Sequence, residues 1–234
     1  MSGAEASLRR EIARFPDSVA ALGALTALLV RAGRLSEAEA PLRSLVRARP
    51  GDADARSNLG NLLRDLGRPV DAEAVLREAL RLRPDHAGAR NNLGAVLRDL
   101  GRGAEAEACF RAALASHPSF PEALLNLGLL LHDAGRAAEA EPCLRGAVSL
   151  RPGAAAGWAA LGGLLRAKGR APDAARCLGE ALRLRPDHAG TACELGNALV
   201  EANRCDEAVA AFGAALRPEP DHAGAALGLG TALA

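Results

Sequence analysis

Seven prolines recur in this chain at intervals of 34 residues, and this period constrains how the chain can fold. It indicates a solenoid, in which each repeat buries its apolar surface against its neighbours. Residues 19–222 span 204 positions, or six times 34, so six repeats are predicted. The prolines are Pro16, Pro50, Pro84, Pro118, Pro152, Pro186 and Pro220. The predicted repeats are 19–52, 53–86, 87–120, 121–154, 155–188 and 189–222, with a capping half repeat at 1–18 and the start of a further repeat at 223–234.

Each predicted repeat contains two amphipathic helices, because its apolar residues follow the i, i+3, i+4, i+7 spacing of a helical face. In the second repeat the first stripe is Leu59, Leu62, Leu63 and Leu66, and the second is Ala72, Leu76, Ala79 and Leu80. Pro84 prevents the second helix from continuing, and Asp85 is expected to cap the next helix. Breaks within the repeats are predicted at Gly33, Gly67, Gly101, Gly135, Gly169 and Asn203.

The repeat resembles that of the tetratricopeptide family, which has Leu-Gly at positions seven and eight and alanine at positions 20 and 27. The Leu-Gly pairs begin at Leu59, Leu93, Leu127, Leu161 and Leu195. The first repeat departs from the pattern, with Thr26 and Leu45 where glycine and alanine are usual. Position four also departs from it at Arg56, Arg90 and Ala192, whereas Trp158 fits it. The resemblance implies an all-α, right-handed superhelical solenoid that binds ligands on a concave face lined by the first helix of each repeat.

Composition argues against nucleic-acid and membrane partners. The formal charge is only +1, with 29 basic and 28 acidic residues, so the electrostatic attraction to nucleic acid is missing. Aromatic residues make up 2% of the chain, which leaves little for base stacking. The longest segment free of Asp, Glu, Lys and Arg is 152–165, shorter than the roughly 20 residues that span a bilayer.

The sequence predicts no catalytic, cofactor-binding or metal-binding residues. It contains no P-loop, H-E-x-x-H, G-x-S-x-G or complete G-x-G-x-x-G motif. Five cysteines without a C-x-x-C pair indicate neither a disulfide framework nor a zinc site. Cys109, Cys143 and Cys177 recur every 34 residues and are interpreted as small apolar residues of the second helix. A reducing, cytoplasmic location is the simplest expectation.

Asparagines recur at position six, which the resemblance places on the concave face. They are Asn58, Asn92 and Asn126. An asparagine amide carries both a donor and an acceptor, so such a row can pair with a peptide backbone of any sequence. The row resembles the asparagine ladder in the repeat domain of O-linked N-acetylglucosamine transferases, although Ala160 and Glu194 end it here. The alternative is that these amides cap or hydrate a solvent-facing turn.

Charged and polar residues at positions nine, 12 and 13 extend the candidate groove. They are Asn61, Arg64, Asp65, Arg98, Asp99, His132, Asp133, Arg166 and Asn197. These residues either grip side chains of an extended ligand or form surface ion pairs of about 0–1 kcal/mol each. The clamp with which related domains hold acidic chaperone termini is missing, because Lys168 is the only lysine and lies at position 14.

The sequence therefore predicts a scaffold that binds a protein or an extended peptide in its concave groove. Two alternatives stay open: the substrate-recognition arm of a larger transferase, such as a bacterial O-linked N-acetylglucosamine transferase, and a structural spacer or oligomerisation module. The last segment, 223–234, is a first helix without its second and carries an apolar face. Self-association through this incomplete repeat, or continuation of the chain, is expected.

Overall fold

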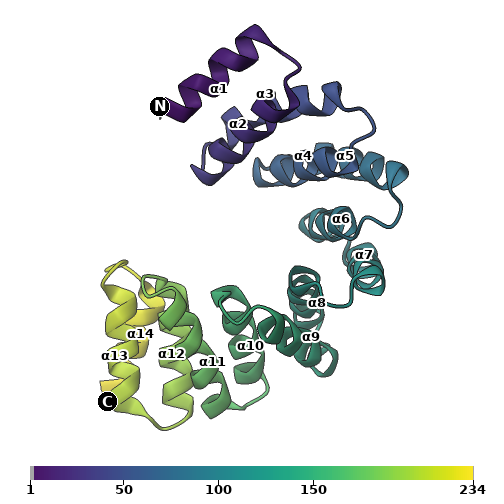
Figure 1. Cartoon of the computed structure of the whole chain (residues 1–234). Coiled ribbons are helices and arrows are strands. Elements are labelled where there is room, and N and C mark those ends of the chain that lie inside the picture. Colours follow the sequence, from purple (N-terminus) through teal and green to yellow (C-terminus); the bar gives the residue numbers. More distant parts are fainter. Residues whose placement is uncertain (1–2, 234) are drawn as a thin grey trace. The chain divides into compact units, whose positions relative to one another are not determined.

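The computed structural model describes residues 3–233, and Met1, Ser2 and Ala234 of the predicted end segments lie outside this range. Within it the chain forms fourteen α-helices and no strand, as the sequence predicts (Figure 1). The chain divides into two compact units, one ending at Pro118 and the other beginning at Ser119. Each unit is a stack of antiparallel helix pairs, which makes the fold an all-α repeat solenoid.

The first unit contains seven helices that pack against one another in sequence order (Figure 1). In the described part of the chain, helix α1 has no partner helix before it and packs on α2. The helices that follow form pairs, in which the first is called helix A and the second helix B. The bounds are α1 (Gly3–Arg14), α2 (Val19–Arg31), α3 (Leu35–Ala48), α4 (Ala53–Asp65), α5 (Pro69–Leu82), α6 (Ala87–Asp99) and α7 (Gly103–Ser116).

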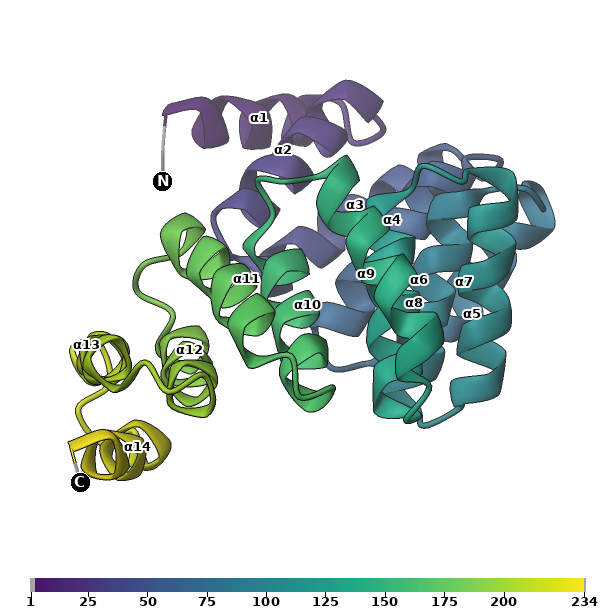
Figure 2. The same cartoon turned by 90° about the horizontal axis from the view of Figure 1, so that it is seen from below.

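The second unit consists of further pairs of helix A and helix B and ends in a single helix A (Figure 2). Its last helix packs against both helices of the preceding pair. The bounds are α8 (Pro121–Asp133), α9 (Ala137–Leu150), α10 (Ala155–Ala167), α11 (Ala171–Leu184), α12 (Ala189–Glu201), α13 (Cys205–Leu216) and α14 (Ala223–Leu233).

Glycine at position eight lets the two helices of a pair approach closely. A Cβ atom built on Gly60 would lie 2.4 Å from Cγ of Leu76, and one on Gly94 would lie 2.6 Å from the ring of Phe110. Both large side chains are fully buried. The same contact recurs in the second unit at Gly128, Gly162 and Gly196. The Leu-Gly pairs therefore form the centre of each helix hairpin.

The turns between helix A and helix B have the predicted left-handed residues. Gly33, Gly67, Gly101, Gly135 and Gly169 have φ values of 70–75°, and Asn203 has a φ of 55°. Glycine adopts this conformation without a steric penalty, and asparagine tolerates it better than most residues. The predicted positions of these breaks are confirmed.

The helix caps between repeats differ from the expectation at Asp85. Capping in the second repeat follows the usual pattern, with Asp52 accepting a hydrogen bond from the backbone N–H of Ala55 at 2.9 Å. Before α6, however, Nδ1 of His86 accepts from the N–H of Ala89, and His188 accepts likewise from Thr191. The residue directly before the helix is the cap, so histidine replaces aspartate in this role.

A row of arginines, which the sequence analysis did not identify, connects successive helices B. Arg102 pairs with Glu105 three residues later at 2.7 Å and with Glu73 of the preceding helix B at 2.8 Å. The same 29-residue offset joins Arg34 to Glu5, Arg68 to Glu39 and Arg170 to Glu141. Because Glu5 lies on α1, this helix occupies the place of a helix B. The pairs with Arg34 and Arg9 also lower the pKa of Glu5.

Candidate peptide-binding face

The candidate residues of the first unit lie on the surface of helices A that helices B leave uncovered. Asn58 and Asn61 lie one helical turn apart on α4, and Asn58 is exposed. Asn58 has no hydrogen-bond partner among the described residues, so both its donor and its acceptor face solvent. Asn61 donates to Oδ2 of Asp65 at 3.3 Å. These amides are positioned to contact a ligand that lies across α4.

Asn92 occupies the equivalent position on α6 but is held by its neighbour. Its side-chain amide donates to the hydroxyl of Ser57 on α4 at 3.1 Å and to the Ser57 carbonyl at 3.4 Å. Ser57 is buried, whereas Asn92 is half-buried. The donor of Asn92 therefore serves helix packing, and its carbonyl oxygen is the group left for a ligand.

A hollow of about 270 Å³ opens beside Asn58 and Asn61, between α2, α3 and α4. One side is polar and consists of Asn58, Asn61 and Asp65 of α4. The rest is largely apolar. It is lined by Gly23, Thr26, Ala27, Val30, Leu35, Leu42, Leu45 and Leu62. The hollow thus places apolar surface next to hydrogen-bonding groups.

The first pair of helices differs from the second in ways that account for this hollow. Ser57 on α4 bonds to Asn92, but the equivalent residue on α2 is Gly23, which has no side chain to offer Asn58. Helices α4 and α6 are in direct contact, whereas α2 and α4 lie further apart. Thr26 also replaces the glycine that elsewhere admits a large helix B side chain. Looser packing in the first repeat leaves the space.

The charged residues at positions 12 and 13 of this unit pair with one another. Arg64 lies 2.9 Å from Asp65 and 3.8 Å from Asp99 of the next helix A. Arg98 lies 3.8 Å from Asp99. These side chains are 28–41% exposed, so the pairs are surface interactions of modest strength. Their mutual pairing is the arrangement that the ion-pair alternative of the sequence analysis describes.

The second unit carries the remaining candidate residues: Asn126, His132 and Asp133 on α8, Arg166 on α10 and Asn197 on α12. Arg166 bridges to Glu194 at 3.1 Å and to Glu201 at 3.0 Å, both on α12. Burial by itself lowers the pKa of this guanidinium, but the pairs with Glu201 and Glu194 together outweigh it and raise the pKa above its usual value. Glu194, which ends the asparagine row, therefore serves as a partner of the preceding helix A.

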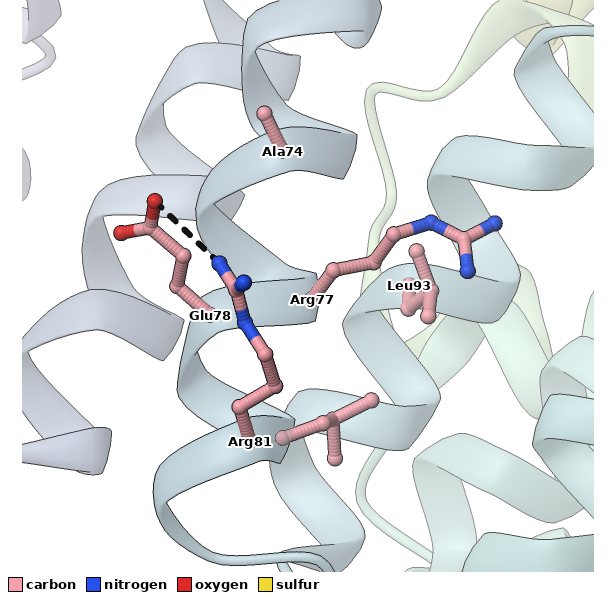
Figure 3. A pocket seen from close by; sticks show the side chains of 6 residues that line it. Ala74, Arg77, Glu78, Arg81 and Leu93 are labelled. Atoms are coloured by element: carbon pink, nitrogen blue, oxygen red, sulfur yellow. Dashed lines mark ion pairs between the residues drawn. The ribbon is translucent and has the colours of Figure 1, made fainter.

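A larger hollow, of about 520 Å³, lies over α5 and α6 and includes none of the predicted residues (Figure 3). Glu78 and Arg81, one turn apart on α5, pair at 3.5 Å, and Arg77 extends past Leu93. Arg77 also pairs with Glu73 at 2.7 Å. Because its charged groups satisfy one another, this hollow presents a weaker ligand site than the one beside Asn58.

The cysteines are free thiols, of which Cys177 and Cys193 are buried and Cys109 and Cys143 are half-buried. Burial raises the pKa of Cys109, Cys177 and Cys193, which disfavours the reactive thiolate. Residues 3–233 contain no cluster of three or more His, Cys, Asp or Glu side chains that could hold a metal ion. Over the same residues, each helix falls short of the length and apolar character that crossing a membrane requires.

The apolar lining of the hollow is the part of the candidate site that the sequence analysis missed. Thr26 and Leu45 were recognised as departures from the repeat pattern, but no role followed from them. The available signal was that both residues are larger than the glycine and alanine usual at these positions, which indicates altered packing in the first repeat. Gly23, which leaves Asn58 without a neighbour, carried no signal because glycine is frequent in this chain.

Two models of known protein families match the sequence. A tetratricopeptide repeat model matches residues 2–53, 57–108 and 193–234. A second model, the middle TPR-like domain of cilia and flagella-associated protein 70, matches residues 91–185. No curated protein matches the chain.

Solved structures share the fold at low sequence identity. A chain from the APC/C hetero-tetramer Cut9–Hcn1 is 20% identical with a TM-score of 0.86, and the match covers 97% of this chain but 45% of that one. PilF of Pseudomonas aeruginosa is 20% identical, with a TM-score of 0.76 and coverage of 89% and 95%. YrrB, a TPR protein with an unusual peptide-binding site, is 23% identical, with a TM-score of 0.63 and coverage of 80% and 96%. With a repeat model matched over more than half of its length, the chain belongs to the tetratricopeptide repeat family.

Proposed function

We propose that this scaffold binds an extended peptide segment of a partner protein along its helix A surface. The observation that carries the proposal is the pair Asn58 and Asn61, one turn apart on α4 at the edge of a hollow. An amide can donate to a backbone carbonyl and accept from a backbone N–H, so it binds an extended strand irrespective of its sequence. YrrB, with a similar fold, is a precedent for a peptide site in such a protein.

The other predicted residues take supporting roles in this proposal. Within the first unit Asn92 contributes a further contact through its carbonyl oxygen, and on the second unit Asn126 provides the equivalent amide. The charged residues select side chains of the ligand, because charge complementarity favours some partners over others. They are Arg64, Asp65, Arg98, Asp99, His132, Asp133 and Arg166, with Asn197 as an additional polar contact. The substrate arm of a larger transferase would use the same surface.

The experiment compares peptide affinity in two variants of the intact chain. Replacing both Asn58 and Asn61 by alanine removes two amide contacts, each expected to contribute about 0.5–1.5 kcal/mol. Affinity for many different bound peptides should then fall by a similar factor, from about fivefold to more than a hundredfold. The control replaces Asp65 and Asp99 by asparagine, which should change the ranking of peptides instead. Unchanged affinity after loss of both amides would contradict the proposal.

A second candidate function is self-association through α14. Leu227 and Leu233 are 75% and 69% exposed, and the space beside Gly230 is open. At the equivalent glycines of the other repeats a leucine or phenylalanine of helix B fills this space. The structure offers one such helix in α1, where Leu8 is half-exposed. We propose that α1 of a second copy packs on α14, which predicts a concentration-dependent mass that Leu8→Glu abolishes. A constant monomer mass at high concentration would contradict it.

A further inference from the structure

The hollow between α2, α3 and α4 has an apolar lining and a carboxylate, neither of which the proposed amide contacts use. We propose that it is a specificity pocket for one bulky apolar side chain of an extended peptide, with a basic residue next to that side chain. This inference rests on the proposed peptide-binding function and adds to it the class of sequence that binds. The occupant is an apolar anchor of a peptide and not a free small molecule.

The size of the hollow supports a single side chain as the occupant. Its volume of about 270 Å³ lies just below the roughly 300–1,000 Å³ that is usual for small-molecule pockets. Its lining includes Val30, which is 42% exposed and therefore open to a ligand. Covering such surface with an apolar group is favourable, because apolar area leaves water. A leucine, methionine or phenylalanine side chain fits within this volume and suits the apolar lining.

The polar groups of the hollow fix how the peptide lies. Asn58, Asn61 and Asp65 have the i, i+3, i+7 spacing of one helical face, and all three line the same side of the hollow. A backbone that crosses α4 beside the hollow therefore bonds to the two amides while its side chain enters the apolar part. This geometry joins sequence-independent backbone contacts to one sequence-dependent contact.

Charge selects the neighbour of the anchor residue. Among the residues that line the hollow, Asp65 is the only charged one. Its Oδ1 atom accepts from Arg64 at 2.9 Å, but its Oδ2 atom has only the 3.3 Å contact with Asn61. The carboxylate therefore has room for a second cationic partner, and an acidic neighbour would be repelled. A basic residue beside the apolar anchor can therefore pair with Asp65, whereas an acidic residue there is disfavoured.

A random peptide library displayed on phage and selected on the intact chain tests this inference. Bound peptides should share a bulky apolar residue with Lys or Arg beside it. A synthetic peptide of that sequence is then titrated against Ala27→Leu, which fills the hollow, and Ala24→Leu, the matched control. Both alanines are exposed on α2, but only Ala27 lines the hollow. Filling the hollow should weaken binding about tenfold or more, and the control should change it less than about twofold.

Two further variants separate the pocket from simple obstruction of the surface. Leu45→Ala enlarges the hollow, so selection on this variant should shift toward aromatic anchors. Asp65→Asn should remove the preference for a basic neighbour while leaving the apolar anchor in place. Agreement of both shifts with these expectations supports a pocket that reads side-chain size and charge.

The outcomes distinguish the pocket from the proposed function. If selected peptides bind, lose affinity on loss of Asn58 and Asn61, and are insensitive to Ala27→Leu, peptide binding stands and the pocket is overturned. Selected sequences without a shared apolar residue overturn it as well. A library that yields no binding peptide overturns both proposals.

Discussion

The side-chain amide of Asn92 on α6 lies 3.1 Å from the hydroxyl of Ser57 on α4 and links the helices A of two successive repeats. Asn58 holds the same repeat position but faces Gly23, so it lacks this link. Two residues that look identical in sequence therefore have different surroundings. One amide contributes to packing, and the other is available to a ligand.

This difference predicts opposite effects of the same substitution on stability. Asn92→Ala should lower the free energy of unfolding by about 1 kcal/mol, because it removes a hydrogen bond and leaves the Ser57 hydroxyl unpaired. Asn58→Ala should leave stability unchanged or slightly raise it, because alanine is the better helix former. Urea denaturation of the two variants measures both effects. Equal destabilisation would show that the Asn92–Ser57 contact contributes nothing.

Two adjacent glycines on α10 give a sharper test of the close helix contact. A Cβ on Gly162 would lie 2.6 Å from Cγ of Leu178, whereas a Cβ on Gly163 would meet nothing within 4 Å. Gly162→Ala should therefore destabilise the chain by about 1–3 kcal/mol through overpacking. Gly163→Ala should stabilise it by up to about 1 kcal/mol, since it removes a glycine from a helix interior. The result would contradict the packing argument if both variants changed the urea midpoint in the same direction.

The fold was predictable because the repeat period sets turn, helix and glycine positions together. The 34-residue spacing predicted alternating helices, and the left-handed turns at Gly67 and Asn203 followed from residue chemistry alone. The arginine row was not predicted, because Arg102 and Glu73 are 29 residues apart and meet only once repeats stack. The hollow also depends on looser packing of the first repeat, which residue types indicated only indirectly through Thr26. Local structure was therefore readable from the sequence, whereas contacts between repeats were not.

The arginine row predicts how stability depends on pH. Lys168, Arg145 and Arg170 surround Glu141 and lower the pKa of its carboxyl from 4.5 to about 2. A carboxyl whose pKa is lower in the folded than in the unfolded state stabilises the fold above the unfolded value. This contribution is lost as the pH falls toward the folded value. Glu141→Gln should therefore lower the urea midpoint at neutral pH, and the difference from wild type should shrink between about pH 5 and pH 2.

Glu207→Gln is the matched control for this experiment. Among the described residues Glu207 pairs with Arg204 alone and is 59% exposed, whereas the Glu141 side chain is 13% exposed and has three cationic neighbours. The pairing with Arg204 also lowers the pKa of Glu207, but solvent screens an exposed pair more strongly. The control should lose less stability at neutral pH and show a shallower pH dependence. Parallel curves for the two variants would show that the stacked position of Glu141 has no effect.

In the second unit α12 has a side-chain cap and α10 lacks one, so removing the first cap should destabilise the chain and adding the second should stabilise it. His188 caps α12 by accepting from the N–H of Thr191 at 3.1 Å, whereas Ala154 precedes α10 and offers no side-chain cap. His188→Ala should cost about 1 kcal/mol, and His188→Asp should restore most of it, because Asp52 serves the same role before α4. Ala154→Asp should raise stability by about 0.5–2 kcal/mol, since the backbone before α10 is extended, as it is before α12. Thermal unfolding followed by circular dichroism at neutral pH measures all three. If Ala154→Asp lowered the melting temperature, a side-chain cap would not be what α10 lacks.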